Sequence, residues 1–289
     1  MTTAPGAVNR WVLAARPRTL PAAIVPVGVG AALVRPETIN WVNTALAAAV
    51  ALLLQIGTNY ANDYSDGVRG TDEQRVGPFR LTASKLVPAR WVKFAAFACF
   101  GLAAAAGLGL AARTSWWLIA LGASAILAGY LYTGGPKPYG YLGLGELFVL
   151  LYFGLLATVG TAYVQHGRVV GAAWWIGLAT GSMACALLEA NNLRDVLGDI
   201  AAGKRTLAAR VGRERGAWLF VACVAGVAIG LALGGEPLVA LVALVAYVPG
   251  VRMAFSPRRG RELLALLQSS SRVQLALGAL LIVVYAVTR

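Results

Sequence analysis

Charge is scarce in this chain, and acidic residues are the scarcest of all. Of its 289 residues only 12 are Asp or Glu, and 13% are charged in total. A soluble domain usually carries about 25% charged residues, so this composition excludes an ordinary soluble protein. There is one histidine, and the three cysteines, Cys99, Cys185 and Cys223, lie far apart in the sequence. This spacing indicates neither a zinc site nor a disulfide framework.

Long apolar runs take the place of the missing charge. Hydrophobic residues make up 58% of the chain, and the mean hydropathy is +0.69. A membrane-spanning helix needs roughly 17 to 25 such residues. We predict nine transmembrane helices, at about 20–35, 41–61, 92–112, 115–133, 142–164, 171–190, 217–234, 237–253 and 272–288. The expected fold is an all-α polytopic membrane protein, with residues 1–289 forming a single membrane domain.

The formal net charge of +13 could suggest nucleic-acid binding, but its distribution argues against that. With the N-terminus in the cytoplasm, the nine-helix layout places all but four of the 25 Lys and Arg on the cytoplasmic side. The exceptions are Arg35, Arg113, Arg168 and Arg289. Such an asymmetry orients membrane proteins. We therefore expect a multi-pass protein of the cell (plasma) membrane, surrounded by lipid, with no nucleic-acid partner.

All five aspartates fall in two short clusters. The first cluster contains Asn59, Asn62, Asp63, Asp66 and Asp72, and the second contains Asn191, Asn192, Asp195 and Asp199. Spacings of three and four residues align such side chains on one face of a helix. Carboxylates held together repel unless a cation lies between them, and hard oxygen ligands suit Mg²⁺ bound with a phosphorylated substrate.

The clusters therefore predict a diphosphate site that is bridged by metal and faces the cytoplasm. The predicted metal ligands are Asp63, Asp66, Asp72, Asp195 and Asp199. A second interpretation remains open, in which these acids form internal ion pairs with Arg69, Arg194 or Lys204.

Basic side chains near the clusters could complete a diphosphate site. Lys137 follows a Gly-Gly-Pro break, and the remaining candidates are Arg80, Lys85, Lys204 and Arg205. Each could contact phosphate oxygens or be a solvated charge at the membrane interface. Two basic segments, about 64–91 and 194–216, are candidate lids or ordinary connecting loops. Among the aromatic residues, Tyr132 is our candidate for stabilising a carbocation through its ring face.

Three segments carry a resemblance to a known family. Asn-Asp-Tyr-Ser-Asp-Gly at 62–67, Tyr-Thr-Gly-Gly-Pro-Lys-Pro-Tyr-Gly-Tyr at 132–141 and Asn-Asn-Leu-Arg-Asp at 191–195 resemble the UbiA superfamily of intramembrane prenyltransferases. Segments 16–21 and 76–81 also fit. Within the superfamily, the likeness is to the branch that prenylates 1,4-dihydroxy-2-naphthoate in menaquinone biosynthesis. The wider family's first motif would place a third acid at Gly70, whereas this chain has Asp72, as that branch does.

The resemblance implies nine helices around a central cavity and a Mg²⁺-dependent reaction. A polyprenyl group would pass from polyprenyl diphosphate to 1,4-dihydroxy-2-naphthoate with loss of CO₂, giving demethylmenaquinone. The expected catalytic residues are Asp63, Asp66, Asp195, Asp199, Lys137 and Tyr132, and the expected substrate-binding residues are Asn59, Asn62, Arg80, Asn191, Asn192 and Lys204. Alternatives are the acceptors 4-hydroxybenzoate, homogentisate or haem, and a cation transporter, which would place its acids near the bilayer midplane.

Overall fold

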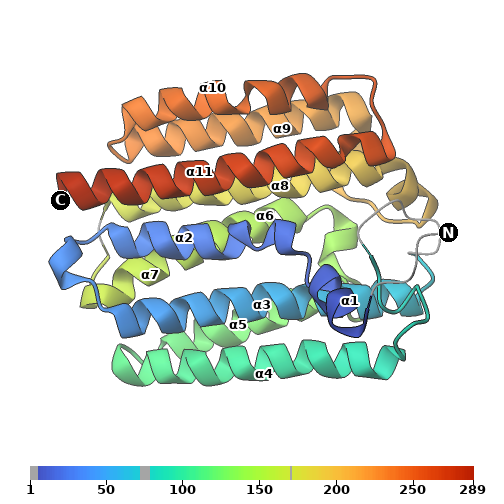
Figure 1. Ribbon diagram of the computed structural model, residues 1–289, viewed down its shortest axis with the longest axis horizontal. Helices are drawn as coiled ribbons and strands as arrows, with labels where there is room; N and C mark the ends of the chain where they lie inside the picture. The colour runs from blue at the N-terminus through green and yellow to red at the C-terminus, as the bar shows by residue number, and fades with distance from the viewer. Residues whose placement is uncertain (1–5, 72–78, 170) are drawn as a thin grey trace.

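The chain forms a bundle of nearly parallel α-helices in a computed structural model that describes residues 6–71, 79–169 and 171–289 (Figure 1). The long helices are α3 (Trp41–Val68), α4 (Ala89–Arg113), α8 (Ala172–Ala201), α9 (Leu207–Leu233), α10 (Pro237–Ala254) and α11 (Leu264–Thr288). A further continuous segment, Gly145–His166, joins α6 (Gly145–Val149), the π-helical η4 (Leu150–Leu156) and α7 (Ala157–His166). No strand occurs in the described part of the chain.

The nine predicted apolar runs all correspond to helical segments, but two are short. Seven segments within the described residues are long and apolar enough to cross a membrane. The other two, α2 (Pro21–Ala32) and α5 (Leu118–Leu131), have 12 and 14 residues. At about 1.5 Å per residue, neither reaches across the hydrocarbon core alone. The all-helical membrane fold is confirmed, and the count of nine spans is approximate.

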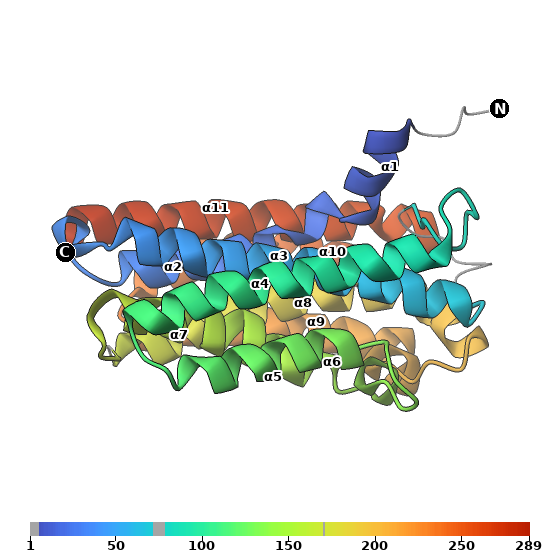
Figure 2. The same ribbon diagram turned by 90° about the horizontal axis from the view of Figure 1, so that it is seen from below.

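The two ends of the bundle differ. The amphipathic helix α1 (Ala7–Ala14) projects from one end, near the turns that follow α3 and α8, and the C-terminus lies at the other end (Figure 2). At the C-terminal end, Arg113 donates to Asn43 Oδ1 at 2.8 Å and Arg289 donates to the Leu33 carbonyl. Two of the four basic residues expected on the non-cytoplasmic side therefore lie at the same end of the bundle, opposite the end that holds the aspartates. Short helical turns complete the chain: η1 (Pro17–Thr19), η2 (Pro36–Thr38), η3 (Tyr139–Leu142) and η5 (Gly260–Leu263).

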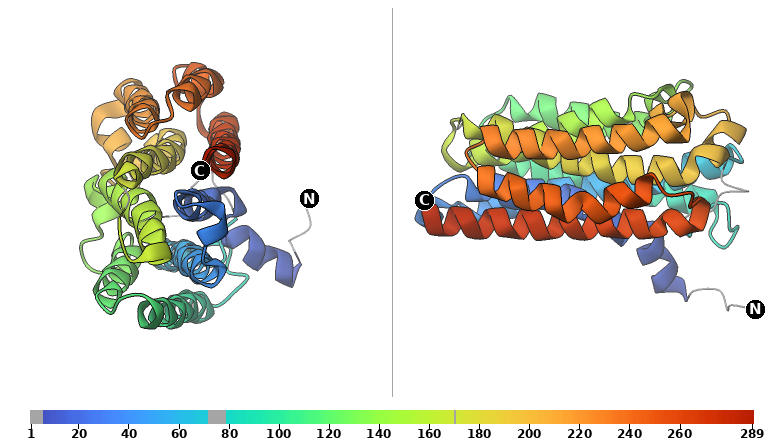
Figure 3. Two further views of the ribbon diagram at one scale, coloured as in Figure 1. Left: turned by 90° about the vertical axis from the view of Figure 1, so that its left-hand side faces the viewer. Right: turned by 90° about the horizontal axis from the view of Figure 1, so that it is seen from above.

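Helix α8 lies inside the bundle, between α9 and the η4 segment (Figure 3). In its most apolar stretch 72% of the residues are buried, against 22% for α3. Small residues allow this close packing, because a Cβ added to Gly154 would stand 2.4 Å from the Cα of Gly181. Membrane helices commonly approach through such glycines. The central helix is also one of the two that carry aspartates.

The four aspartates that the structure describes, Asp63, Asp66, Asp195 and Asp199, lie inside helices rather than where helices give way to loops. Helix α3 continues past Asp66 to Val68, and α8 continues past Asp199 to Ala201. The predicted loop at 194–216 is therefore wrong, because only residues 202–206 separate α8 from α9. The helices continue because their Asn and Asp side chains face the protein interior, where a hydropathy plot still counts them as breaks in an apolar run.

Candidate active site

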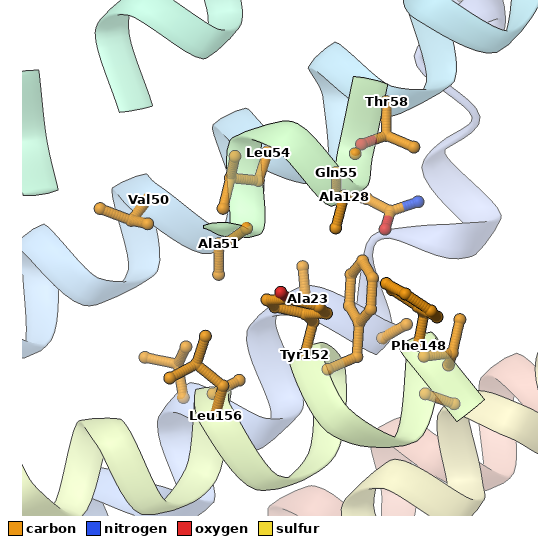
Figure 4. A pocket seen from close by; sticks show the side chains of 18 of the residues that line it. Ala23, Val50, Ala51, Leu54, Gln55, Thr58, Ala128, Phe148, Tyr152 and Leu156 are labelled. Carbon is orange, nitrogen blue, oxygen red and sulfur yellow. The ribbon is translucent and has the colours of Figure 1, made fainter. Parts of the chain in front are cut away.

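Two adjoining cavities lie between the helices. One is mostly apolar, with a volume of about 260 Å³, and follows α3 from Ala47 to Asn62, a length of about 22 Å at helical rise. Leu54, Phe148 and Tyr152 are among the side chains that face it (Figure 4). The other is polar, has a volume of about 400 Å³ and lies at the aspartate end. Six residues line both cavities: Arg16, Thr19, Asn62, Tyr132, Leu188 and Asn191.

An aromatic wall extends from the junction into the apolar cavity. The ring of Tyr132 meets that of Tyr139 edge to face at 5.5 Å. Tyr139 stacks on Phe148 at 4.0 Å, and Phe148 stacks on Tyr152 at 6.1 Å. All four line the apolar cavity, and Tyr132 also lines the polar one. The predicted candidate Tyr132 therefore stands where a charged head group and an apolar tail would meet.

Positive charge predominates in the polar cavity. Among the residues that the structure describes, its lining contains five cations, Arg16, Arg18, Arg80, Arg194 and Lys204, and two carboxylates, Asp66 and Asp199. A concave site with excess cations attracts polyanions, and guanidinium groups bind phosphate oxygens with matched geometry. Arg80 and Lys204 were predicted as substrate-binding residues. Arg194 was predicted only as a candidate ion-pair partner, and Arg16 and Arg18 were assigned no role, although the 16–21 segment carried part of the family resemblance.

Asp66 is held by two partners from distant parts of the chain. Lys204 Nζ lies 2.9 Å from its Oδ2, and the Tyr141 hydroxyl donates to its Oδ1 at 2.6 Å. The ammonium of Lys204 also lies 4.7 Å from the centre of the Tyr141 ring. Burial, and then the negative charge of Asp66, raises the pKa of Tyr141 above its ordinary value. The phenol therefore remains protonated and keeps donating to Asp66.

Asp63 anchors the segment that precedes α4. Its Oδ2 accepts the Leu81 N–H and its Oδ1 accepts the Thr82 N–H, both at 2.8 Å. The carboxylate is 1% exposed and is not part of the polar cavity lining. Asp63 was predicted as a metal ligand, but here it fixes backbone that presents Arg80 to the cavity. Asp72, predicted with it, lies outside the described residues.

The second cluster divides in a similar way. Arg194 grips Asp195 with Nε and one terminal nitrogen, at 2.7 and 2.6 Å, and both side chains are 2% exposed. Asp199 lines the polar cavity. The alternative of internal ion pairs therefore holds for Asp195 with Arg194 and for Asp66 with Lys204. Of the four predicted metal ligands that the structure describes, Asp66 and Asp199 line the polar cavity.

The four asparagines have different positions. Asn59 donates to the Ala15 carbonyl at 2.8 Å and to Thr19 Oγ1 at 3.2 Å. It thereby fixes the turn in which Arg16 adopts a left-handed φ of 54°. Such backbone conformations cost energy and are found mainly at functional sites. Asn62 Oδ1 accepts from Thr133. Asn62, Asn191 and Asn192 line the polar cavity, whereas Asn59 lines the apolar one.

Lys137 does not belong to the site. Its side chain is exposed, and it lines neither cavity. The Gly134-Gly135-Pro136 turn carries it outward, and Arg69 fastens that turn by donating to the carbonyls of Thr133 and Gly135. The predicted catalytic role for Lys137 is therefore not supported, and Lys204 is the lysine inside the cavity.

The donor set can be tested against Mg²⁺. Within the described residues, no three His, Cys, Asp or Glu side chains converge as a ready-made metal site. Mg²⁺, however, is usually bound through one or two carboxylates together with substrate phosphates and water. Asp66 and Asp199 line one cavity with the amide groups of Asn62, Asn191 and Asn192. These hard oxygen donors fit an ion that arrives with a diphosphate.

The sequence and fold can now be compared with those of known proteins. The model of the UbiA prenyltransferase family matches residues 23–262, and the chain belongs to that family. It is 47% identical to 1,4-dihydroxy-2-naphthoate octaprenyltransferase of Mycobacterium tuberculosis, over 92% of this chain and 93% of that protein. The enzyme of the same name from Escherichia coli is 37% identical, over 74% of this chain and 72% of its own length.

Solved structures share the fold. A UbiA homologue from Archaeoglobus fulgidus, bound to DMAPP and Mg²⁺, superposes with a TM-score of 0.70 at 17% identity, covering 95% of this chain and 99% of that one. The apo UbiA homologue from Aeropyrum pernix K1 gives a TM-score of 0.66 at 15% identity, covering 93% and 96%. The helical arrangement described above is therefore that of UbiA proteins.

Proposed function

We propose that this protein transfers a polyprenyl group from polyprenyl diphosphate to 1,4-dihydroxy-2-naphthoate, with release of diphosphate and CO₂. The observation that carries the proposal is the 47% identity to a naphthoate octaprenyltransferase across nearly the whole of both chains. The paired cavities supply the physical basis, because one is cationic and the other is apolar and lined by aromatic rings.

The cavities suggest how the donor binds. The diphosphate lies among Arg16, Arg80 and Lys204, and the polyprenyl chain enters the apolar cavity past Tyr132. This orientation places the bond between the allylic carbon and the diphosphate oxygen near the aromatic wall. Mg²⁺ held by Asp66 and Asp199 would neutralise phosphate charge and assist its departure. The cations continue to hold the diphosphate as negative charge builds on it.

The transfer balances without another reagent. The allylic C–O bond breaks and its electron pair leaves with the diphosphate. The electron-rich naphthoate ring then donates a pair to form the new C–C bond. Loss of the carboxyl group as CO₂ returns a pair of electrons to the ring, so that prenyl replaces carboxylate. The rings of Tyr132 and Tyr139 line the apolar cavity, and in this proposal they stabilise the allylic cation between these events, as ring faces do for other cations.

Location and orientation complete the proposal. We place the protein in the cell membrane with the polar cavity at the cytoplasmic face, because the basic residues predominate at that end. An aromatic acid made in the cytoplasm then reaches the cavity without crossing the membrane.

Purified protein in detergent, given Mg²⁺, a polyprenyl diphosphate and the naphthoate, should release pyrophosphate and CO₂ and form a prenylated quinol. Parallel reactions should contain 4-hydroxybenzoate or homogentisate as the acceptor. Turnover with either of these, and none with the naphthoate, would assign the chain to another branch of the family. Absence of pyrophosphate release with every acceptor would refute prenyl transfer.

A further inference from the structure

Two glutamates, one half-buried and one fully buried, lie beside the proposed site, and the chemistry above uses neither of them. Glu146 lies in the first turn of the Gly145–His166 segment, and Glu189 lies in α8. Glu189 is 0% exposed, and its oxygens have no hydrogen-bond partner of normal geometry among the described residues. Carboxyl groups within membrane segments are costly and usually functional. This pair therefore needs a physical explanation.

Glu146 holds a residue of the polar cavity. Its Oε1 accepts a hydrogen bond of 2.8 Å from Nδ2 of Asn192. The backbone carbonyl of Glu146 is in turn held by the thiol of Cys185 at 3.2 Å. A side-chain amide is planar, and its carbonyl oxygen and its NH₂ group point in different directions within that plane. With its NH₂ bound to Glu146, Asn192 must direct Oδ1 away from Glu146.

The helix geometry shows where that oxygen points. Asn192 and Asp199 are seven residues apart, which places them on the same face of α8. Both line the polar cavity, whereas Glu146 does not. Asn192 is 7% exposed, so its free surface is the part that faces this cavity. Its carbonyl oxygen and the carboxylate of Asp199 are therefore presented to the same space.

The position of Glu146 favours its role as an acceptor. The N–H groups of a helix's first turn stabilise negative charge, and Glu146 lies in that turn. The carboxyl of Glu189 stands beside it and restricts the directions in which Glu146 can turn. In this group, the hydrogen bond of normal geometry is the one that Asn192 donates to Glu146.

We propose that Glu146 is a positioning residue, which fixes the amide of Asn192 so that its carbonyl oxygen serves as a neutral ligand for the divalent cation accompanying the diphosphate. The inference rests on the proposed function. It adds Asn192 to the proposed ligands Asp66 and Asp199, and Glu146 as the residue that orients Asn192. Groups that orient metal ligands through hydrogen bonds typically change metal affinity or activity by about 10-fold to 100-fold when removed.

The test compares Glu146→Met with Glu146→Gln. Methionine has a similar length but only a weakly accepting thioether, whereas the Gln oxygen can accept from Asn192 with its NH₂ directed to Glu189. Thermal unfolding is followed in detergent with polyprenyl diphosphate, without acceptor, as Mg²⁺ is titrated. E146M should raise the Mg²⁺ concentration at half-maximal stabilisation about 10-fold to 100-fold, and E146Q should stay near wild type. In turnover assays, KM for the naphthoate should not change.

Asn192→Ala supplies the second arm. If Glu146 acts through Asn192, then E146M combined with N192A should need no more Mg²⁺ than N192A alone, since effects within one unit are not additive. If E146M fails to fold, Glu146→Ala is measured in its place. A wild-type Mg²⁺ midpoint in a folded Glu146 variant would overturn this inference alone. If polyprenyl diphosphate stabilises the wild-type protein equally with and without Mg²⁺, both the proposed metal chemistry and this inference would be overturned.

Discussion

Lys204 and Asp66 form a buried ion pair of 2.9 Å although 138 residues separate them in the chain. Asp66 comes from α3, and Lys204 comes from the connection between α8 and α9. The pair joins the two aspartate-bearing helices across the polar cavity. The pair also neutralises the carboxylate of Asp66, and in the proposed function an incoming diphosphate and its cation would compete for both partners.

Lys204 should contribute more to donor use than Lys137. Lys204→Ala should lower kcat/KM for the prenyl diphosphate, because it removes a cation from the cavity. The corresponding loss of transition-state stabilisation should be about 2 to 4 kcal/mol. Lys137→Ala, with its exposed side chain, is the matched control and should remain near wild type. Steady-state kinetics with both substrates check the pair. A large loss in K137A with an unchanged K204A would reverse the assignment.

Asp66 and Asp199 should be required for turnover. Asp66→Asn and Asp199→Asn each preserve size but remove a charge that faces the cavity, so kcat should fall by about 10²-fold or more. Glu214→Gln, at an exposed position of α9, controls for the loss of a charge. Membrane yield and thermal unfolding should stay close to those of wild type. Normal turnover in either Asp variant would remove that residue from the proposed metal site.

Asp63 should act differently from Asp66. Asp63→Ala leaves the buried N–H of Leu81 and the N–H of Thr82 without their acceptor, at a cost of about 1 to 3 kcal/mol for each group that becomes unsatisfied. Thermal unfolding in detergent should therefore show clear destabilisation, along with lost activity as Arg80 moves. If D63A is inactive but as stable as wild type, direct participation in metal or substrate binding would be the better explanation.

The glycine contact between η4 and α8 should determine stability. Gly154→Ala places a methyl group against the Gly181 backbone, where 2.4 Å is too close for real atoms. Overpacking of this kind costs about 1 to 3 kcal/mol. Gly122→Ala is the control, since a Cβ there has nothing within 4 Å. Thermal unfolding of the two variants should differ clearly, and equal stabilities would show that the helices can separate without penalty.

The polar cavity should open to the cytoplasm. Single cysteines at the exposed positions Ala201 and Glu37 mark opposite ends of the bundle, once Cys99, Cys185 and Cys223 have been replaced. An impermeant thiol reagent should label A201C in inside-out vesicles and E37C in intact cells. The opposite pattern would invert the protein in the membrane and contradict a cytoplasmic source for the acceptor.

Periodicity and hydropathy were enough to predict much of the fold. Every predicted apolar run corresponds to a helical segment, because lipid-facing and buried apolar residues give the same signal in a sequence. The helix ends near the aspartates were not predictable in this way. Asp66 and Asp199 are 2% and 4% exposed, so they face protein, and hydropathy does not distinguish a residue that faces protein from one that ends a span.

The composition of the site was only partly readable. Lys137 and Lys204 both follow glycine-containing turns next to a helix end, and only the tertiary fold turns Lys204 inward. Glu146 carried a signal that could have been used, since an isolated acid inside an apolar run is costly. Asp195 is turned from the cavity by its ion pair with Arg194, and Asp63 by its hydrogen bond from the Leu81 N–H. No sequence pattern reveals that these partners lie close to the two aspartates.

The different burial of α8 and α3 has a consequence for the membrane around the protein. Because α8 is enclosed by other helices and α3 is less buried, a thinner or thicker bilayer acts more directly on α3 and on α8 mainly through its neighbours. Mismatched membranes tilt the helices that they touch. The Lys204–Asp66 pair connects α3 with the segment that follows α8. A change in bilayer thickness should therefore alter the distance between Asp66 on α3 and Asp199 on α8.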